Sequence, residues 1–311
     1  MLLKTNPPIV AIVGAGRVGR VLGRRLRERG WRIGPVVTRS MRSARIARRY
    51  IGSGTPQAGL SEALLAADLI LIATPDRLIA ETAAALAGLG GTNRSRGTRQ
   101  ARAAKRAGGR EWQGKIILHT SGAVGSEVLG PLARRRAAVG SLHPLQTFSG
   151  RTAPSLTGCT CSVEGSAAAV RMARRVCRDL DCISVVLPRR HKSAYHAAAA
   201  LSAGHVLGVM EAAVRMLVAV GFPRKRAVHA LLLLTRQTLA NYERLGARAA
   251  WTGPLSRDDF GVVERHLRAL QRFPREYREA YAALSRLGVN VLASRESSKR
   301  RELDETLARI K

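Results

Sequence analysis

The feature that most constrains the fold is a glycine-rich turn directly after a short apolar run, in IVAIVGAGRVGRVLGRRLRERG (residues 9–30). Gly14, Gly16 and Gly19 form the pattern G-x-G-x-x-G between the predicted strand Ile9–Val13 and a helical pattern. The first glycine permits a tight turn, the second lets the backbone approach a diphosphate, and the third lets helix and strand pack closely. Unpaired N–H groups at the helix N-terminus add donors, so the pattern favours a dinucleotide site over a generic glycine-rich connection. The residues expected to hold the dinucleotide at this turn are Gly14, Gly16, Arg17, Val18 and Gly19.

Short apolar runs alternate with helical patterns through the first half of the chain, which is typical of a parallel sheet covered by helices. After Pro188 the strands stop, and Ala/Leu-rich helical segments follow at 190–220, 223–248, 256–271 and 274–287. We therefore expect an α/β fold, with a doubly wound Rossmann domain followed by an all-helical domain. The predicted strands are Ile9–Val13, Arg32–Val37, Asp68–Ala73, Lys115–His119, Ala138–Leu142, Thr160–Val163 and Cys182–Leu187, with a helix from Ser166 to Leu180.

The change of pattern near Pro188 divides the chain into three expected parts. A nucleotide-binding domain covers 1–188, a helical substrate and dimerisation domain covers 189–290, and a charged terminal helix covers 291–311. Residues 88–113 are rich in Gly and Arg and lack apolar periodicity, which indicates a surface insertion within the first domain.

The end of the second predicted strand indicates which dinucleotide is preferred. Rossmann domains that bind NAD usually place Asp or Glu about 20 residues after the glycine turn, where it bonds the ribose 2′-hydroxyl. This chain has arginine and hydroxyl side chains there instead, and an arginine can pair with the 2′-phosphate of NADP. NADP is therefore expected ahead of NAD, although an arginine-rich chain would also place an arginine here by composition alone. The expected contacts are Thr38, Arg39, Ser40 and Arg42.

A third turn follows the buried strand in DLILIATPD (residues 68–76). Loops at the carboxyl ends of parallel strands reach the cofactor in this kind of fold. Ala73, Thr74 and Pro75 are therefore expected beside the nicotinamide half of the dinucleotide. Asp76 is interpreted as the N-cap of the next helix.

Two further strands end in residues that can carry proton chemistry, in LHTSGAVGSEVL (118–129) and GSLHPLQTF (140–148). Reduction of a C=O or C=N bond needs a proton beside the hydride, and histidine is the commonest donor near neutral pH. His143, whose backbone is restricted by Pro144, is the leading candidate. Ser121 is expected to hold a substrate oxygen or to orient that imidazole. His119 is the weaker candidate because it lies earlier on its strand and is expected inside the sheet.

The segment HKSAYHAAAALSAGH (191–205) opens the helical half. Helical spacing places Lys192, Tyr195, His196 and Ala199 on one face, where the lysine, the tyrosine hydroxyl and the histidine can bind a carboxylate and shuttle a proton. A solvated first helical turn with a buried histidine explains the same residues equally well.

Charge and cysteine usage bound the remaining possibilities. The chain has 53 Lys and Arg against 21 Asp and Glu, a formal charge of +32, which would attract nucleic acid without specificity. The positive residues run along the whole chain without interleaved aromatics, so solvated helix faces are the preferred explanation. Four cysteines show neither metal-ligand spacing nor a disulfide framework. We expect a reduced, cytoplasmic protein without a metal or a membrane span.

At this point a family resemblance is visible. HTSGAVGSEVL, SLHPLQTF, KSAYHAAAALSAGHVL and LTRQTLANYERLG…WTGPLSRDD resemble bacterial Rossmann-like proteins that carry a C-terminal domain of unknown function, number 2520. More distantly, the layout is similar to pyrroline-5-carboxylate reductases, 6-phosphogluconate and β-hydroxyacid dehydrogenases, and prephenate dehydrogenases. The resemblance implies a helical dimerisation domain of the 6-phosphogluconate dehydrogenase type. In prephenate dehydrogenases a serine after one strand and a His-Pro after the next carry the chemistry, and Ser121 and His143-Pro144 match that order. The insertion at 88–113 and Asp258, where glycine is expected, depart from the family pattern.

The leading hypothesis is an NADP-dependent reductase or dehydrogenase acting on a small anionic keto or imino substrate. A homodimer through the helical domain is expected. The alternatives are a dinucleotide-binding sensor or interaction module without chemistry, and, last, a nucleic-acid binder driven by charge.

Overall fold

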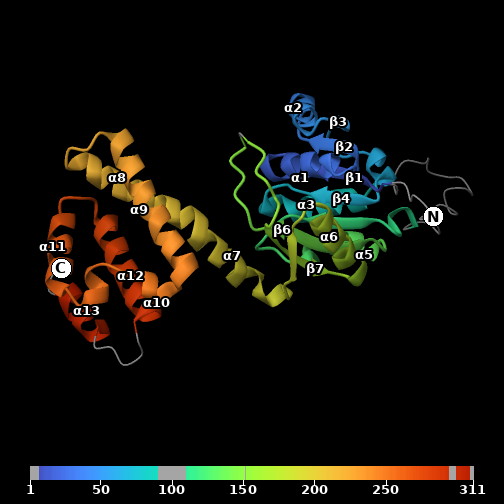
Figure 1. Ribbon diagram of the computed structural model, residues 1–311. Helices are drawn as coiled ribbons and strands as arrows, with labels where there is room; N and C mark the ends of the chain where they lie inside the picture. The colour runs from blue at the N-terminus through green and yellow to red at the C-terminus, as the bar shows by residue number, and fades with distance from the viewer. Residues whose placement is uncertain (1–6, 90–109, 151, 294–298, 309–311) are drawn as a thin grey trace, which may run out of the picture. The chain divides into compact units, whose positions relative to one another are not determined.

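Residues 7–89, 110–150, 152–293 and 299–308 are described in the computed structural model of the chain (Figure 1). The chain is divided into two compact units, Met1–Ala203 and Gly204–Lys311. The first unit thus extends beyond the boundary expected at Pro188 and includes the helix that carries Lys192 and His196. The central part of the expected insertion, 90–109, lies outside the described residues.

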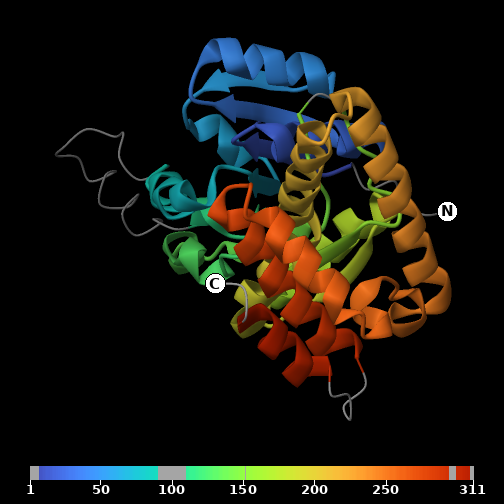
Figure 2. The ribbon, with the colours of Figure 1, turned by 90° about the vertical axis from the view of Figure 1, so that its left-hand side faces the viewer.

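The first unit contains an eight-stranded sheet in the order β3-β2-β1-β4-β5-β6-β7-β8 within the described residues. All neighbouring strands run parallel except β6 and β7, which pair antiparallel. Figure 2 shows β1 to β3 side by side in the blue part of the chain. The strands are β1 (Ile9–Val13), β2 (Arg32–Thr38), β3 (Thr55–Ala58), β4 (Leu69–Ile72), β5 (Ile116–His119), β6 (Ala138–Pro144), β7 (Thr160–Gly165) and β8 (Ile183–Val186).

Helices cover both faces of this sheet, as a doubly wound fold requires. On one face α1 and α6 pack against β1, β4, β5, β6 and β7, and α2 packs beside α1. On the other face α3 and α5 pack against the same central strands. The helices are α1 (Arg17–Glu28), α2 (Met41–Ile51), α3 (Ile79–Ala87), α5 (Gly130–Arg134), α6 (Ala167–Asp179) and α7 (Lys192–Ala200). Short 3₁₀ turns lie at Glu62–Ala66, Asp76–Leu78, Arg110–Trp112, Ser126–Leu129 and Arg189–His191.

The α/β expectation is confirmed, and each predicted strand matches an observed one. Only β3 was missed, because its sequence TPQA has neither an apolar run nor alternation, and its central proline lies on an edge strand.

The second unit is helical. Its buried core is formed by Val263 and Leu267 of α11, Val289 of α12 and Leu303 of α13. Through Leu303, α13, which corresponds to the expected charged terminal helix, packs onto this unit. Its helices are α8 (Val206–Ala219), α9 (Arg224–Leu245), α10 (Ala247–Ala250), α11 (Phe260–Leu270), α12 (Arg275–Leu292) and α13 (Lys299–Ala308); a π-helical turn, Leu201–His205, precedes α8 and a 3₁₀ turn, Pro254–Arg257, precedes α11.

One helical stretch in the described residues, Arg189–Ala219, has the length and composition of a membrane-crossing helix, which the sequence reading did not anticipate. Only 6% of its most apolar window is buried. On α8 and α9 the exposed apolar side chains include Leu207 at 71% and Leu234 at 64%.

Candidate active site

The glycine turn between β1 and α1 is shaped by close backbone approach. Gly14 has φ +84°, and a Cβ there would lie 2.6 Å from the backbone N of Thr74. A Cβ on Gly19 would lie 2.8 Å from the carbonyl oxygen of Gly14, so helix and strand touch at this point. By contrast, the nearest atom to a Cβ on Gly16 is 3.9 Å away. Only the middle glycine therefore faces open space.

The turn has the features that a diphosphate needs. Gly16 is the N-cap of α1 without a side-chain cap, and the first turn of the helix holds no acidic residue. The hydroxyl of Thr74, on the neighbouring turn, is buried without a hydrogen-bond partner. A bound group with acceptor oxygens would satisfy both the helix N–H groups and this hydroxyl. The residues therefore fit a dinucleotide.

The end of β2 lies beside this turn, since Gly14 and Ala15 both donate backbone hydrogen bonds to the carbonyl of Val37. Arg39 and Arg42 are exposed, as a contact to a phosphate requires. Ser40 has a structural duty in addition, because its hydroxyl caps α2 by accepting from Ser43 N at 3.3 Å. The Thr38 hydroxyl donates to the Ser40 carbonyl at 2.8 Å.

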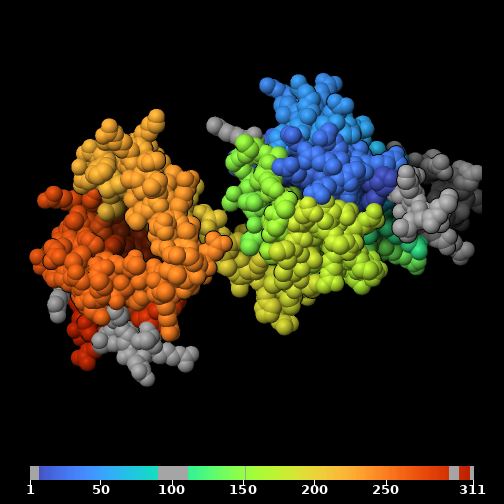
Figure 3. Space-filling model, in the orientation of Figure 1, coloured from blue at the N-terminus to red at the C-terminus, as the bar shows by residue number. Residues whose placement is uncertain are grey.

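The segment after β6 lies against α1. The Arg20 guanidinium bonds the carbonyl of Gly150, and Arg25 donates to the carbonyls of Ala153 (2.7 Å) and Pro154 (2.9 Å). Figure 3 shows this green segment against the blue surface of the first unit. Two arginines thus hold the segment close to the glycine turn.

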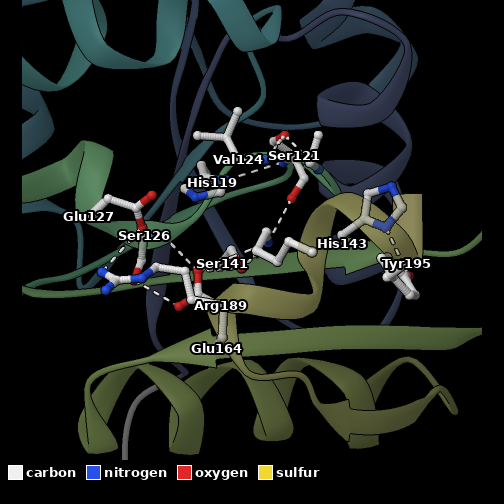
Figure 4. A network of polar contacts seen from close by, with 12 residues as sticks. His119, Ser121, Val124, Ser126, Glu127, Ser141, His143, Glu164, Arg189 and Tyr195 are labelled. Atoms are coloured by element: carbon white, nitrogen blue, oxygen red, sulfur yellow. Dashed lines mark hydrogen bonds and ion pairs between the residues drawn. The ribbon is translucent and has the colours of Figure 1, made fainter. Parts of the chain in front are cut away.

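His143, near the end of β6, forms the centre of an aromatic cluster. Its Nδ1 lies 3.0 Å from the hydroxyl of Tyr195, and its ring meets those of Tyr195 and His196 edge to face at 5.5 and 5.9 Å. Figure 4 shows Tyr195 reaching His143 from α7. The backbone of Gly122 closes the other side, because a Cβ there would lie 2.8 Å from His143 Nε2 and 2.7 Å from His196 Cδ2.

A pocket of about 470 Å³ opens beside this cluster. Its nine lining residues, all in the first unit, include the two histidines but no Asp, Glu, Lys or Arg. They are His143, Leu145, Gln146, Thr147, His196, Ala199, Ala200, Ser202 and Ala203. Within the first unit the pocket therefore offers hydrogen bonds and no fixed charge.

The imidazole of His143 is held neutral at physiological pH. Burial, followed by the nearby His196 and Lys192, lowers its pKa from 6.5 to about 4. Burial also raises the pKa of the Tyr195 hydroxyl, so the phenol keeps its proton. When Tyr195 donates to Nδ1, the imidazole proton resides on Nε2, the nitrogen beside Gly122.

Ser121 is more deeply engaged in the fold than the sequence suggested. Its hydroxyl donates to Asp76 Oδ2 at 2.8 Å and accepts from the backbone N–H groups of Ala123 and Val124 at 3.2 and 3.0 Å. In the structure Tyr195, not Ser121, is bonded to His143. The interpretation of Asp76 as a helix N-cap was wrong: Pro75 is the N-cap and the carboxylate fixes Ser121 instead.

Lys192 is 1% exposed and points into the ends of the strands rather than into the pocket. Its Nζ donates to the Ser121 carbonyl (3.1 Å) and the Ser141 hydroxyl (2.8 Å) and lies 4.0 Å from Glu164 Oε1. Glu164 also accepts from the N–H (2.6 Å) and hydroxyl (2.9 Å) of Ser126. Burial lowers the pKa of Lys192, and Glu164 opposes this shift. The network, shown in Figure 4, fixes the first turn of α7 against β5, β6 and β7.

The structure therefore separates the residues proposed on α7. His196 reaches the pocket, whereas Lys192 anchors the helix that brings it there. His119 is fully buried, as expected from its place on the strand. The sequence reading missed Glu164, because a single acidic residue on a predicted strand gives no signal of its partners.

The fold and the site define a Rossmann-like α/β protein with a helical second part. Residues 3–144 match the family model of the Rossmann-like domain, and residues 159–287 match the domain of unknown function DUF2520. The chain thus carries a Rossmann-like domain followed by a DUF2520 domain. Comparison with curated protein sequences gives no match.

Solved structures share this fold at low sequence identity. A Bacteroides fragilis protein named as a proposed NADP oxidoreductase is 21% identical, with a TM-score of 0.70 and coverage of 92% of this chain and 99% of that one. An imine reductase variant from Myxococcus stipitatus in complex with NAD⁺ is 18% identical, with a TM-score of 0.60 over 96% and 99%. The pyrroline carboxylate reductase of Plasmodium falciparum with NADP bound is 10% identical, with a TM-score of 0.55 over 98% of each chain.

Proposed function

We propose that the chain is an NADP-dependent oxidoreductase that acts on a small imino or keto compound. The observation that carries the proposal is that the glycine turn, the orphaned Thr74 hydroxyl and His143 all lie at the carboxyl ends of strands of one sheet, where Tyr195 of α7 is bonded to His143. Similarity to an imine reductase and a pyrroline carboxylate reductase supports the same choice.

The cofactor would be held by the residues of three turns. Gly16 and the N–H groups that open α1 receive the diphosphate, Thr74 bonds an adjacent oxygen, and Arg39 with Arg42 meets the 2′-phosphate. When bound, the nicotinamide supplies or accepts a hydride.

The proton that accompanies the hydride belongs to His143. In the reductive direction its Nε2–H gives a proton to the substrate nitrogen or oxygen, and the hydroxyl of Tyr195 passes its own proton to Nδ1. Solvent then restores the proton of Tyr195. Because the described pocket holds no fixed positive charge, we now favour an uncharged substrate over the anionic one that we expected from sequence.

Calorimetric titration with NADPH and NADH tests the cofactor assignment. Arg39→Ala is expected to weaken NADPH binding by about tenfold or more, with a smaller effect on NADH, because only NADPH carries the 2′-phosphate. Arg49→Ala, which removes the same charge from the last turn of α2, is the matched control and should leave both affinities nearly unchanged. Absence of binding of either nucleotide would refute the proposal.

Oxidation of NADPH across a panel of cyclic imines and keto compounds tests the chemistry. His143→Ala is expected to lower turnover by about 10²- to 10⁴-fold while NADPH still binds. Because the pKa of His143 is about 4, the rate should show no break near pH 6.5. NADPH binding without turnover on any compound would favour the dinucleotide sensor, our second candidate.

We also propose that the active particle is a homodimer. The exposed apolar side chains on α8 and α9 need a cover, and a second copy of this surface supplies one of matching character. Light scattering should give twice the 33.5 kDa mass of the chain. A monomer, or a particle that appears only with detergent, would contradict this proposal.

A further inference from the structure

The cysteines form one cluster, although their sequence spacing gave no sign of it. Thr160 of β7 pairs with Ile183 of β8, which sets Cys159 opposite Cys182 one residue earlier on each side. A backbone hydrogen bond from Ile183 N to the Cys159 carbonyl (2.9 Å) confirms this alignment. Because side chains alternate along a strand, Cys159, Cys161 and Cys182 project from the same face of the sheet.

The fourth thiol completes the cluster from α6. Cys177 packs in the same apolar core as Cys161, with Cys159 and Cys182 at its margin. The Cys161 thiol is hydrogen-bonded to both Cys177 and Cys182. Among the described residues no group of His, Cys, Asp and Glu is arranged to hold a metal ion, so metal binding does not account for the cluster.

The members of the cluster differ in access and in acidity. Cys161 is 2% exposed and the pKa of its thiol is raised, whereas Cys182 is only partly buried. The hydrogen bond from Cys161 lowers the pKa of the Cys182 thiol, and Arg29 favours its thiolate, against burial and Asp181. Cys182 is therefore the better nucleophile and Cys161 the protonated neighbour.

Cys182 is partly exposed, and a small pocket lies beside it. Its Sγ lies 3.2 Å from the Leu156 carbonyl and 3.7 Å from the Leu180 carbonyl. Both leucines line a pocket of about 80 Å³, whose rim also carries Arg29. This volume accommodates a molecule of the size of hydrogen peroxide.

We propose that Cys182 and Cys161 form a dithiol site that reduces a small hydroperoxide and becomes a disulfide. The Cys182 thiolate attacks one peroxide oxygen, an S–O bond forms, the O–O bond breaks, and the leaving oxygen takes a proton to become water or an alcohol. The Cys161 sulfur then attacks the Cys182 sulfenic acid. The S–S bond forms, the S–O bond breaks, and the hydroxide leaves as water with the Cys161 proton. Two thiols are oxidised by two electrons and one hydroperoxide is reduced.

This reaction needs no nucleotide, so its test is independent of the proposed oxidoreductase function. The reduced full-length chain is treated with hydrogen peroxide, blocked with N-ethylmaleimide and mapped by peptide mass spectrometry. We expect two of the four thiols to be lost, with a peptide that links Cys161 to Cys182 and disappears on reduction.

Three variants assign the partners. Cys161→Ala should abolish the linked peptide and leave a Cys182 sulfenic acid that dimedone traps. Cys182→Ser should abolish both products. Cys159→Ser, on the same strand face, is the matched control and should still form the disulfide. Circular dichroism establishes that each variant is folded. A disulfide that needs Cys159 in place of Cys161, or four thiols that survive excess peroxide, would overturn the proposal.

Discussion

The buried imidazole of His119 should make the first unit sensitive to acid, and the structure sets the size of the effect. His119 is fully buried, and burial, aided by Lys192, lowers its pKa from 6.5 to about 4. The unfolded chain therefore binds a proton that the folded state refuses between these two pH values. The contribution of neutral His119 to the free energy of unfolding is fully present above pH 6.5 and is lost as the pH falls toward 4. The full loss is about 3.4 kcal/mol, of which about 2 kcal/mol is reached by about pH 5.

His119→Asn isolates this contribution. Asparagine retains an acceptor for the backbone N–H of Ser121, which His119 Nδ1 accepts at 3.2 Å, but it does not titrate. Lost packing lowers the free energy of unfolding equally at both pH values. Between about pH 7.5 and pH 5, the free energy of unfolding should therefore fall by about 2 kcal/mol less in the variant than in the wild type.

Urea unfolding followed by tryptophan fluorescence measures the difference. Trp31 and Trp112 are buried in the first unit, and Trp251→Phe in both proteins removes the signal of the second unit. His143 and the carboxylates titrate in both proteins and cancel in the comparison. Equal acid losses in wild type and variant would refute the assignment to His119.

Three other substitutions test the site. Gly122→Ala should lower turnover by about tenfold or more, because its Cβ would lie 2.8 Å from the ring of His143, to which we assign the proton transfer. Gly130→Ala, with its nearest neighbour at 3.5 Å, should not lower turnover, and equal rates in the two variants would contradict the assignment. Gly14→Ala should abolish NADPH binding in calorimetry, because its Cβ would lie 2.6 Å from the backbone N of Thr74. Gly30→Ala, at a similar φ but with no neighbour within 4 Å, should still leave NADPH binding intact and lower the free energy of unfolding by only about 1 kcal/mol through backbone strain. Lys192→Met should lower the free energy of unfolding, measured in urea, by about 3–5 kcal/mol, because it leaves the buried carboxylate of Glu164 without its positive partner. An unchanged free energy of unfolding would refute the anchoring role of Lys192.

The fold was predictable where its signals are local. The glycine turn after β1 is encoded within one short stretch, and apolar runs marked every strand except β3. Contacts between distant elements were not predictable in this way. Asp76 has the position of an N-cap in the sequence, yet it bonds Ser121 in the turn that follows the neighbouring strand β5. Spacing on one helix could not show that Lys192 and Tyr195 serve different partners, because that depends on where β5, β6 and β7 end.

The cysteines show the same limit. Their sequence separation matches neither a metal site nor a disulfide framework, yet the register of β7 and β8 brings them together. Strand register is a property of the assembled sheet, so a linear pattern does not contain it.

The reversal of direction between β6 and β7 has an evolutionary consequence. Because β7 runs antiparallel to β6, the chain turns back at the edge of the sheet that also carries the glycine turn, and this return supplies Leu145, Gln146 and Thr147 to the pocket. In evolution the length and sequence of this connection between β6 and β7 can change while the sheet and the glycine turn stay the same. Exchange of this connection between related chains would therefore change the lining of the pocket without a change in the sheet.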